Sequence, residues 1–206
     1  MDLAQLNLSA SAVPASHVVV SGLDTVGFGK RAAARIIDIV IHLGVSLITG
    51  LFLGILVVVI ASVAGSPVEP WLERMTADTT ASKILGFFGF VLYSTLCEGL
   101  FGATAGKYLL GMVVLNDDDH RPASYTQAVG RSFAFAIDSL FFGLVGYLSM
   151  KDSPTDQRFG DKWAGTVVAT RASAPPTSLR TPMRFLGAFL LAVMLDAIAV
   201  AVGTLM

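Results

Sequence analysis

The sequence is poor in charged residues and in cysteine, and each shortage excludes a class of protein. Only 14% of its 206 residues are charged and 54% are hydrophobic, whereas a soluble domain usually carries about 25% charged residues. The single cysteine, Cys97, excludes an intrachain disulfide and therefore a disulfide-stabilised secreted scaffold. A net charge of −1 argues against a nucleic-acid-binding protein. The composition indicates a membrane protein.

The sequence also lacks the motifs of common enzymes. It contains no nucleophile–base arrangement, Walker loop or dinucleotide fingerprint, so we expect neither an enzyme nor a bound cofactor. The run Asp117-Asp118-Asp119-His120 offers metal-ligand residue types, but consecutive residues do not converge easily on one ion. We therefore predict a polar turn there and no metal site. Residues 1–27 lack the basic start and apolar core of a cleaved signal peptide and are predicted to be a polar tail.

Long apolar runs are what the sequence does contain. A membrane-spanning helix needs about 20 residues, and four segments qualify: residues 36–64, 84–101, 132–150 and 185–206. Each segment carries one carboxylate, and these are Asp38, Glu98, Asp138 and Asp196. We therefore predict an all-α, multi-pass membrane helix bundle with three to four membrane segments.

The distribution of basic residues predicts the topology through the positive-inside rule. If the third segment enters the membrane and returns on the same side, with a bend near Gly143 and Gly146, twelve of the fourteen Lys and Arg residues lie in the cytoplasm with the N-terminus. Four plain crossings divide the basic residues almost evenly and are the alternative. We favour the re-entrant hairpin.

A polar stripe opens the first segment. It consists of Arg31, Arg35, Asp38, His42, Ser46 and Thr49, whose spacings of three or four place them on one helix face. A charged group near the bilayer centre costs on the order of 2.5–3.5 kcal/mol, so we expect these side chains to face partners or a water-filled cavity. Arg31 and Asp38 form either a structural ion pair or a cation or proton site in which Asp38 titrates. His42 is either a proton relay or a hydrogen bond between helices.

Two other positions have a structural and a functional interpretation. Glu98 either faces Asp38 or Lys107 or marks the interfacial end of a helix. In the last segment Asp196 shares one helix face with small residues, which predicts packing against a neighbouring helix or a second copy of the chain. The residues predicted to pack there are Ala192, Asp196, Ala199 and Gly203.

Several motifs resemble those of the RDD family of small bacterial membrane proteins, which is named for one arginine and two aspartates. Arg31 and Asp38 match the first arginine and aspartate, and Arg131 matches a later arginine. The T-x-G-K-x-L-x-G block of the family matches Thr104, Gly106, Lys107, Leu109 and Gly111, and its closing D-x-x-x-x-T-x-V pattern matches Asp161, Thr166 and Val168. Gly160 stands where many members have histidine.

The resemblance implies a membrane domain over residues 28–171, followed by a linker and an additional C-terminal transmembrane helix over residues 172–206. It also implies the bacterial inner membrane as the location. Sodium/proton exchange has been proposed for some members of the family. The leading hypothesis is therefore movement of an ion or small solute, with ion- or proton-site candidates Arg31, Asp38, His42, Glu98, Lys107, Arg131 and Asp161.

Two alternatives to transport remain open. One is a non-catalytic accessory or scaffolding subunit of a larger membrane complex. The other is a lipid-binding protein that uses Lys107, Arg131 and Lys162 near the cytoplasmic headgroups. The partners we expect are membrane lipid, a second copy of the chain or other membrane proteins, and no nucleic acid.

Overall fold

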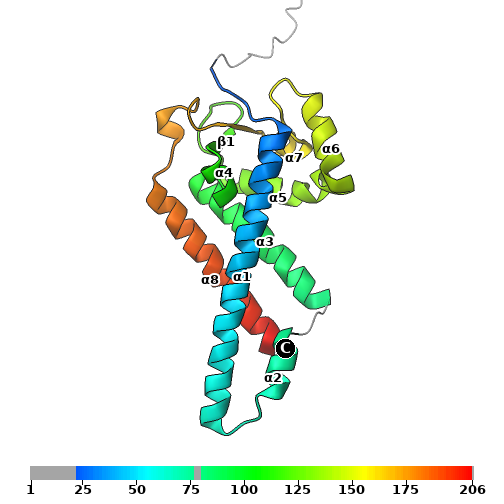
Figure 1. Cartoon of the computed structure of the whole chain (residues 1–206). Helices are drawn as coiled ribbons and strands as arrows, with labels where there is room; N and C mark the ends of the chain where they lie inside the picture. Colours follow the sequence, from blue (N-terminus) through cyan, green and yellow to red (C-terminus); the bar gives the residue numbers. More distant parts are fainter. Residues whose placement is uncertain (1–21, 77–79, 206) are drawn as a thin grey trace, which may run out of the picture.

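The computed structural model describes residues 22–76 and 80–205, and helices dominate this part of the chain (Figure 1). The helices are α1 Phe28–Ala64, α2 Glu69–Thr76, α3 Thr80–Phe101, α4 Ala105–Leu109, α5 Tyr125–Asp138, α6 Leu140–Lys151, α7 Phe159–Ala164 and α8 Pro182–Leu205. Two short strands, β1 Met112–Asn116 and β2 Thr166–Thr170, and a 3₁₀ turn at Pro176–Ser178 are added to them. The predicted all-α membrane class is confirmed, and the small sheet is an element that we did not predict.

Helix α1 runs the length of the described structure (Figure 1). Its 37 residues extend about 55 Å at 1.5 Å per residue, which is well beyond the roughly 30 Å hydrocarbon core of a bilayer. The helix ends at Gly65, whose backbone is left-handed (φ 66°) and whose amide donates to the carbonyls of Ala61 and Ser62. Most large apolar side chains in the second half of α1 are exposed, as on a helix that faces lipid.

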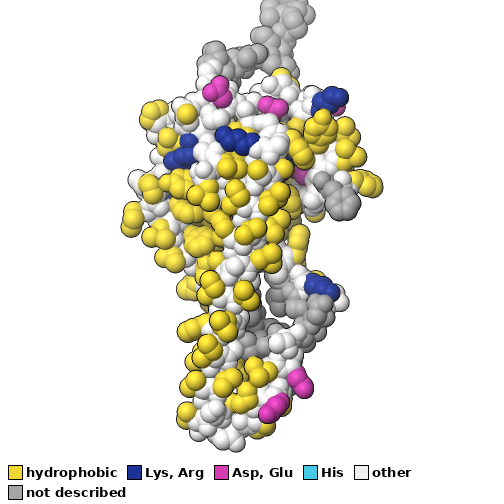
Figure 2. All heavy atoms as spheres, viewed as in Figure 1, with side chains coloured by type: hydrophobic (Ala, Val, Ile, Leu, Met, Phe, Trp, Pro, Cys, Tyr) yellow, Lys and Arg dark blue, Asp and Glu magenta, His cyan; other side chains and the backbone are white. Residues whose placement is uncertain are grey.

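Among the described residues, two helical segments are long and apolar enough to cross a membrane, Phe28–Ala64 and Pro176–Leu195. A third is present if α5 and α6 together make one bent span, whereas the apolar part of α3, Gly86–Phe101, is shorter. Figure 2 shows hydrophobic side chains covering α1 between charged groups at the upper end and others beside α2 and the start of α3. This distribution is that of a membrane protein.

The third apolar segment is bent. Helix α5 ends at Asp138, and the axes of Tyr125–Asp138 and Gly143–Lys151 meet at 108°. Phe141 and Gly143 have left-handed backbone, with φ of 52° and 88°, so the chain turns at one of the two glycines at which we expected it to bend. The segment has the geometry of a broken span or a re-entrant loop and not that of a straight crossing.

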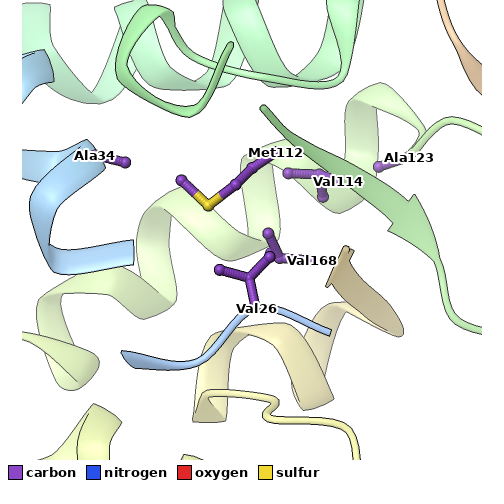
Figure 3. Packing of buried hydrophobic residues seen from close by; sticks show 6 residues of the cluster. All are labelled: Val26, Ala34, Met112, Val114, Ala123 and Val168. Carbon is purple, nitrogen blue, oxygen red and sulfur yellow. The ribbon is translucent and has the colours of Figure 1, made fainter. Parts of the chain in front are cut away.

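The two strands join the chain segments that follow α4 and α7. Strand β1 pairs antiparallel with β2, with Val114 opposite Val168. The amide of Val26 donates to the Val168 carbonyl at 3.0 Å, and the Val26 side chain packs between the strands and α1. Figure 3 shows this cluster, which consists of Val26, Ala34, Met112, Val114, Ala123 and Val168. The sheet therefore fixes the start of α1, and the described end of the predicted tail, residues 22–27, lies against it.

Helices α3 and α8 pack against each other beside α1. Their shared core consists of Tyr93, Leu96, Cys97, Ala105, Ala188 and Ala192. The small side chains of Ala188 and Ala192 allow the two helices to approach closely. Rings of Phe185 and Phe189 from α8 complete the contact. This core holds the carboxyl end of α3 next to α1 and α4.

Candidate functional site

Nine charged side chains gather where the first half of α1 meets α3, α4, α5 and α7. We call them the charged cluster: Arg31, Arg35 and Asp38 of α1, Glu98 of α3, Lys107 of α4, Arg131 and Asp138 of α5, Arg158 just before α7, and Asp161 of α7. Five are basic and four acidic, so the formal net charge of the cluster is +1. Burying charged side chains beside a membrane helix is energetically costly, so such residues are usually paired with an opposite charge or have a functional role.

The Asp38 carboxylate is fully hydrogen-bonded. It accepts from the Gly106 amide at 2.7 Å, from the Thr104 hydroxyl at 2.7 Å and from the Tyr93 hydroxyl at 3.0 Å. The Asp38 residue is only 1% exposed. Because the donors come from α3 and from the start of α4, Asp38 joins α1 to both helices as a structural anchor.

The local sequence around α4 explains this anchor. Thr104 caps α4 through its side-chain oxygen, which accepts from the Lys107 amide, while its hydroxyl donates to Asp38. A Cβ built on Gly106 would overlap the Ala34 carbonyl and lie 3.1 Å from the Asp38 Cγ. Only glycine allows α4 to come this close to α1. The Thr-x-Gly-Lys motif is therefore a docking element for Asp38.

Arg31 is paired with Asp161, which corrects the first of the two interpretations of Arg31 and Asp38, the structural ion pair between them. Seven residues separate Arg31 from Asp38 by about 10 Å along the helix, and the Arg31 side chain points toward the helix N-terminus and away from Asp38. Arg31 binds the Asp161 carboxylate through Nη1 and also donates to the Val26 carbonyl at 2.7 Å and the Asp156 carbonyl at 2.7 Å. The arginine thus ties the start of α1 to α7.

Asp161, Arg131 and Glu98 continue the network. Arg131 donates to Asp161 Oδ1 at 2.7 Å and to Glu98 Oε2 at 3.1 Å, and Lys107 binds Glu98 Oε1. Glu98 is buried, so it faces Lys107 and does not mark an interfacial helix end. Because Lys107 and Arg131 are engaged in these pairs, Lys162 is the exposed member of the three residues considered for lipid headgroups.

The charged cluster shifts the pKa of groups that lie outside the membrane helices, Asp161 and Lys107 among them. Burial raises the pKa of the Asp161 carboxyl, but Arg131, Arg31 and Arg158 more than offset it and hold that pKa well below its usual range. Burial lowers the pKa of the Lys107 ammonium to about 8, against the opposing effect of Glu98. Asp161 is therefore a fixed negative charge at neutral pH.

A cavity of about 30 Å³ lies inside the cluster. A cavity of this kind needs about 10–15 Å³ to hold a water molecule, so there is room for water and for little else. The cavity is lined by Arg35, Ser94, Glu98, Lys107, Arg131, Ser132, Phe135, Asp138, Arg158, Gly160 and Asp161. Within the part of the chain that the structure describes, two buried polar atoms on this lining lack a hydrogen-bond partner, Asp138 Oδ1 and Arg158 Nε.

Three residues of this site were not among the predicted site residues. Asp138 and Arg35 were visible in the sequence as charges in apolar segments, but nothing in the pattern placed them at one cavity. The guanidinium of Arg35 lies 4.0 Å from the Phe135 ring centroid and donates to the Ser94 hydroxyl at 3.2 Å. Arg158 lies in a long polar loop, where sequence spacing gives no signal.

His42 lies outside the charged cluster. Its ring centroid is 5.3 Å from that of Phe90 and 6.4 Å from that of Tyr93. It borders a smaller cavity of about 10 Å³ together with Tyr93, Phe189 and Ala192. His42 and Asp38 thus lie on either side of Tyr93, whose ring is near His42 and whose hydroxyl donates to Asp38.

The predicted packing face of α8 is described only in part. Ala192 is buried against α3. The side chains of Asp196, Ala199 and Gly203 lie outside what the structure describes. Their packing stays a prediction.

Comparison with known proteins gives one match. The model of the RDD family matches residues 25–165, which includes every residue of the charged cluster. No curated protein and no solved structure matches the chain. Since the match covers more than half of the sequence, this membrane protein belongs to the RDD family.

Proposed function

We propose that this protein carries a small ion across the bacterial inner membrane, coupled to proton movement. The observation that supports the proposal is the cavity lined by seven charged side chains beside the membrane helices. Burying charges costs several kcal/mol per ion unless they are paired. A membrane protein that keeps unpaired polar atoms around a cavity commonly uses them for an ion or proton pathway.

The size of the cavity favours an ion or a proton over an organic solute. About 30 Å³ accommodates water or a partly dehydrated ion. An organic substrate of the usual kind occupies a pocket of roughly 300–1,000 Å³. The class of cargo is therefore a small inorganic ion.

Polar groups lead from the cavity along α1 toward the middle of the membrane. Arg35 borders the cavity, and the anchor Asp38 follows it on the same face of α1 and holds the Tyr93 hydroxyl in place. His42 lies one turn further on beside the Tyr93 ring, followed by Ser46 and Thr49. This order supports a pathway that begins at the cytoplasmic end of α1, as the positive-inside rule places it.

The test is ion flux in proteoliposomes with two leucine variants of α5. Ser132 borders the cavity and accepts from the Thr95 hydroxyl at 2.7 Å, so Ser132→Leu fills the cavity. Ala136 is exposed on the same helix, so Ala136→Leu adds similar bulk away from the cavity. We expect cation-dependent proton movement in the wild type and in Ala136→Leu, and at least roughly tenfold slower movement in Ser132→Leu.

Two results would contradict the proposal. Equal flux in Ser132→Leu and Ala136→Leu would show that the ion does not pass through the cavity. Folded wild-type protein that moves no proton under sodium, potassium or proton gradients would exclude a carrier and favour an accessory subunit of a larger membrane complex.

A further inference from the structure

Asp138 differs from the other buried carboxylates of the cluster in its hydrogen bonding. Asp38 accepts from three donors, and Asp161 and Glu98 each bind two basic side chains. Asp138 is only 6% exposed, yet its Oδ2 accepts one hydrogen bond, from the Gly160 amide at 3.2 Å. Its Oδ1 has no donor in the described part of the chain. An ionised oxygen in this position is unfavourable.

The backbone around Asp138 is shaped to hold its carboxyl group. A Cβ on Gly160 would lie 2.9 Å from Asp138 Oδ2 and 2.9 Å from the Ala134 Cβ, so the carboxyl occupies the space that a side chain at position 160 would need. Helix α6 approaches from the other side through Gly146, where an added Cβ would meet the Asp138 Cβ at 3.5 Å and the Arg158 Cδ at 3.7 Å. Asp138 and Arg158 are therefore neighbours across Gly146.

The charged groups that face the same cavity come from α1, α3, α4, α5 and the α7 region, whereas α6 packs against Asp138 through Gly146 and adds no charge to the lining. These groups are Arg35 of α1, Glu98 of α3, Lys107 of α4, Arg131 of α5, and Arg158 and Asp161 at α7. Glu98 and Asp161 are already bound by basic partners on both carboxylate oxygens. Asp138 is the cavity carboxylate that keeps a free oxygen, and Arg158 Nε is a free donor on the same lining.

We propose that Asp138 is a proton-binding site, loaded from water in the cavity and positioned by Gly160 and Arg158. A hydronium ion transfers its proton to Oδ1, which leaves a neutral carboxylic acid and a water molecule. Oδ1, which lacks a donor as an ionised oxygen, thereby becomes a hydroxyl that donates to the water molecule, and the water also accepts from Arg158 Nε. The inference rests on the proposed carrier function for its role, since it names Asp138 as the residue that couples proton movement to the cargo.

The first test detects the proton itself and does not depend on transport. The probe is infrared difference spectroscopy of the full-length protein in lipid, titrated from about pH 9 to about pH 5, a range well above the ordinary carboxyl pKa. We expect a C=O stretch of a protonated carboxylic acid to appear as the pH falls, and to be absent in Asp138→Asn. Asp118→Asn, which changes an exposed turn residue, should retain the band.

A labelled wild-type sample keeps the test valid if Asp138→Asn does not fold. With ¹³C-labelled aspartate, the band should shift to the frequency of the labelled carboxyl, which identifies an aspartic acid without a substitution. No protonated aspartate in this pH range, or a band that persists in folded Asp138→Asn, would overturn the proposal.

Flux measurements separate this inference from the carrier proposal. We expect Asp138→Asn to lower proton-coupled flux at least roughly tenfold. Wild-type flux that is unchanged in folded Asp138→Asn would overturn the role of Asp138 and leave the carrier standing. A protonated Asp138 in a protein without flux would support the proton site and exclude the carrier.

Discussion

The number of donors that each buried carboxylate receives separates structural from functional residues. Asp38 accepts from hydroxyl and amide donors and Asp161 from two guanidinium groups, so both oxygens of each carboxylate have a partner. Asp138 receives one backbone amide. Asp38 and Asp161, which match the two aspartates in the family name, thus act as structural anchors. Asp138, which is not part of that motif, is the aspartate that we propose to exchange a proton. A loss of flux in Asp38→Asn would therefore report the loss of a structural contact between α1, α3 and α4, and not the loss of a proton site.

The Asp161 carboxylate should make stability depend on acid pH. Its pKa is lower in the native protein than in the unfolded chain, where it is near 4. As the pH falls below about 4, the unfolded chain therefore binds a proton first, and the stability contributed above that pH is lost. We expect Asp161→Asn to lower the free energy of unfolding by about 3–5 kcal/mol at neutral pH, because Arg31 and Arg131 lose their shared partner.

Thermal unfolding in detergent as a function of pH checks this expectation. The melting temperature of the wild type should fall below about pH 4, and that of Asp161→Asn should depend less on pH there. Asp119→Asn changes an exposed acid that pairs with an exposed arginine, and it should stay within about 0.5 kcal/mol of the wild type. A folded Asp161→Asn as stable as this control would show that the ion network contributes little.

Among the elements, the five-residue helix α4 depends most on a close backbone contact. Gly106 lies against the Ala34 carbonyl of α1, and backbone atoms of a long helix have little room to yield. We expect Gly106→Ala to destabilise the protein by about 1–3 kcal/mol, the usual cost of overpacking. Release of the Asp38 hydrogen bonds would accompany this loss. The measurement is thermal unfolding in the same detergent.

Gly44→Ala is the matched control on α1. A Cβ on Gly44 meets nothing within 4 Å, and alanine in a helix interior is favoured over glycine by about 0.5–1 kcal/mol. Gly44→Ala should therefore be as stable as the wild type or more so. Equal melting temperatures for both alanine variants would contradict the close α1–α4 contact.

At the scale of the whole molecule, the polar loops lie at the two opposite ends of α1 (Figure 1). The turn to α2 lies at one end, and the sheet, α7 and the 3₁₀ turn lie at the other (Figure 1). The native Cys97 is fully buried, so single added cysteines can report orientation. In right-side-out vesicles we expect an impermeant maleimide to label Ser66→Cys directly. Asp118→Cys and Thr177→Cys, at exposed positions of the opposite end, should react only after permeabilisation.

This experiment decides the orientation. Labelling of Asp118→Cys and Thr177→Cys from outside, with Ser66→Cys protected, would invert the topology. Labelling of Asp118→Cys and Thr177→Cys on different sides would show that the α5–α6 pair crosses the membrane, as in the four-crossing alternative.

The sequence by itself determined the membrane class, the helical segments and the polar face of α1. These features depend on runs and spacings within one segment, and a helix converts spacing into a shared face without help from the rest of the chain. The sequence also contained the docking motif with Thr104 and Gly106. It did not reveal that this motif binds Asp38, because the contact joins residues 66 and 68 positions apart.

Only the tertiary structure determined which charged side chains form ion pairs with one another. Arg31 finds Asp161 across 130 residues, although Asp38 lies much closer in sequence. Strands β1 and β2 pair only because the loops that contain them are brought together at the start of α1. The cavity beside Asp138 exists because α1, α3, α5 and α7 leave a water-sized space between side chains. Each of these depends on the path of the chain in space, and hydrophobic periodicity carries no information about that path.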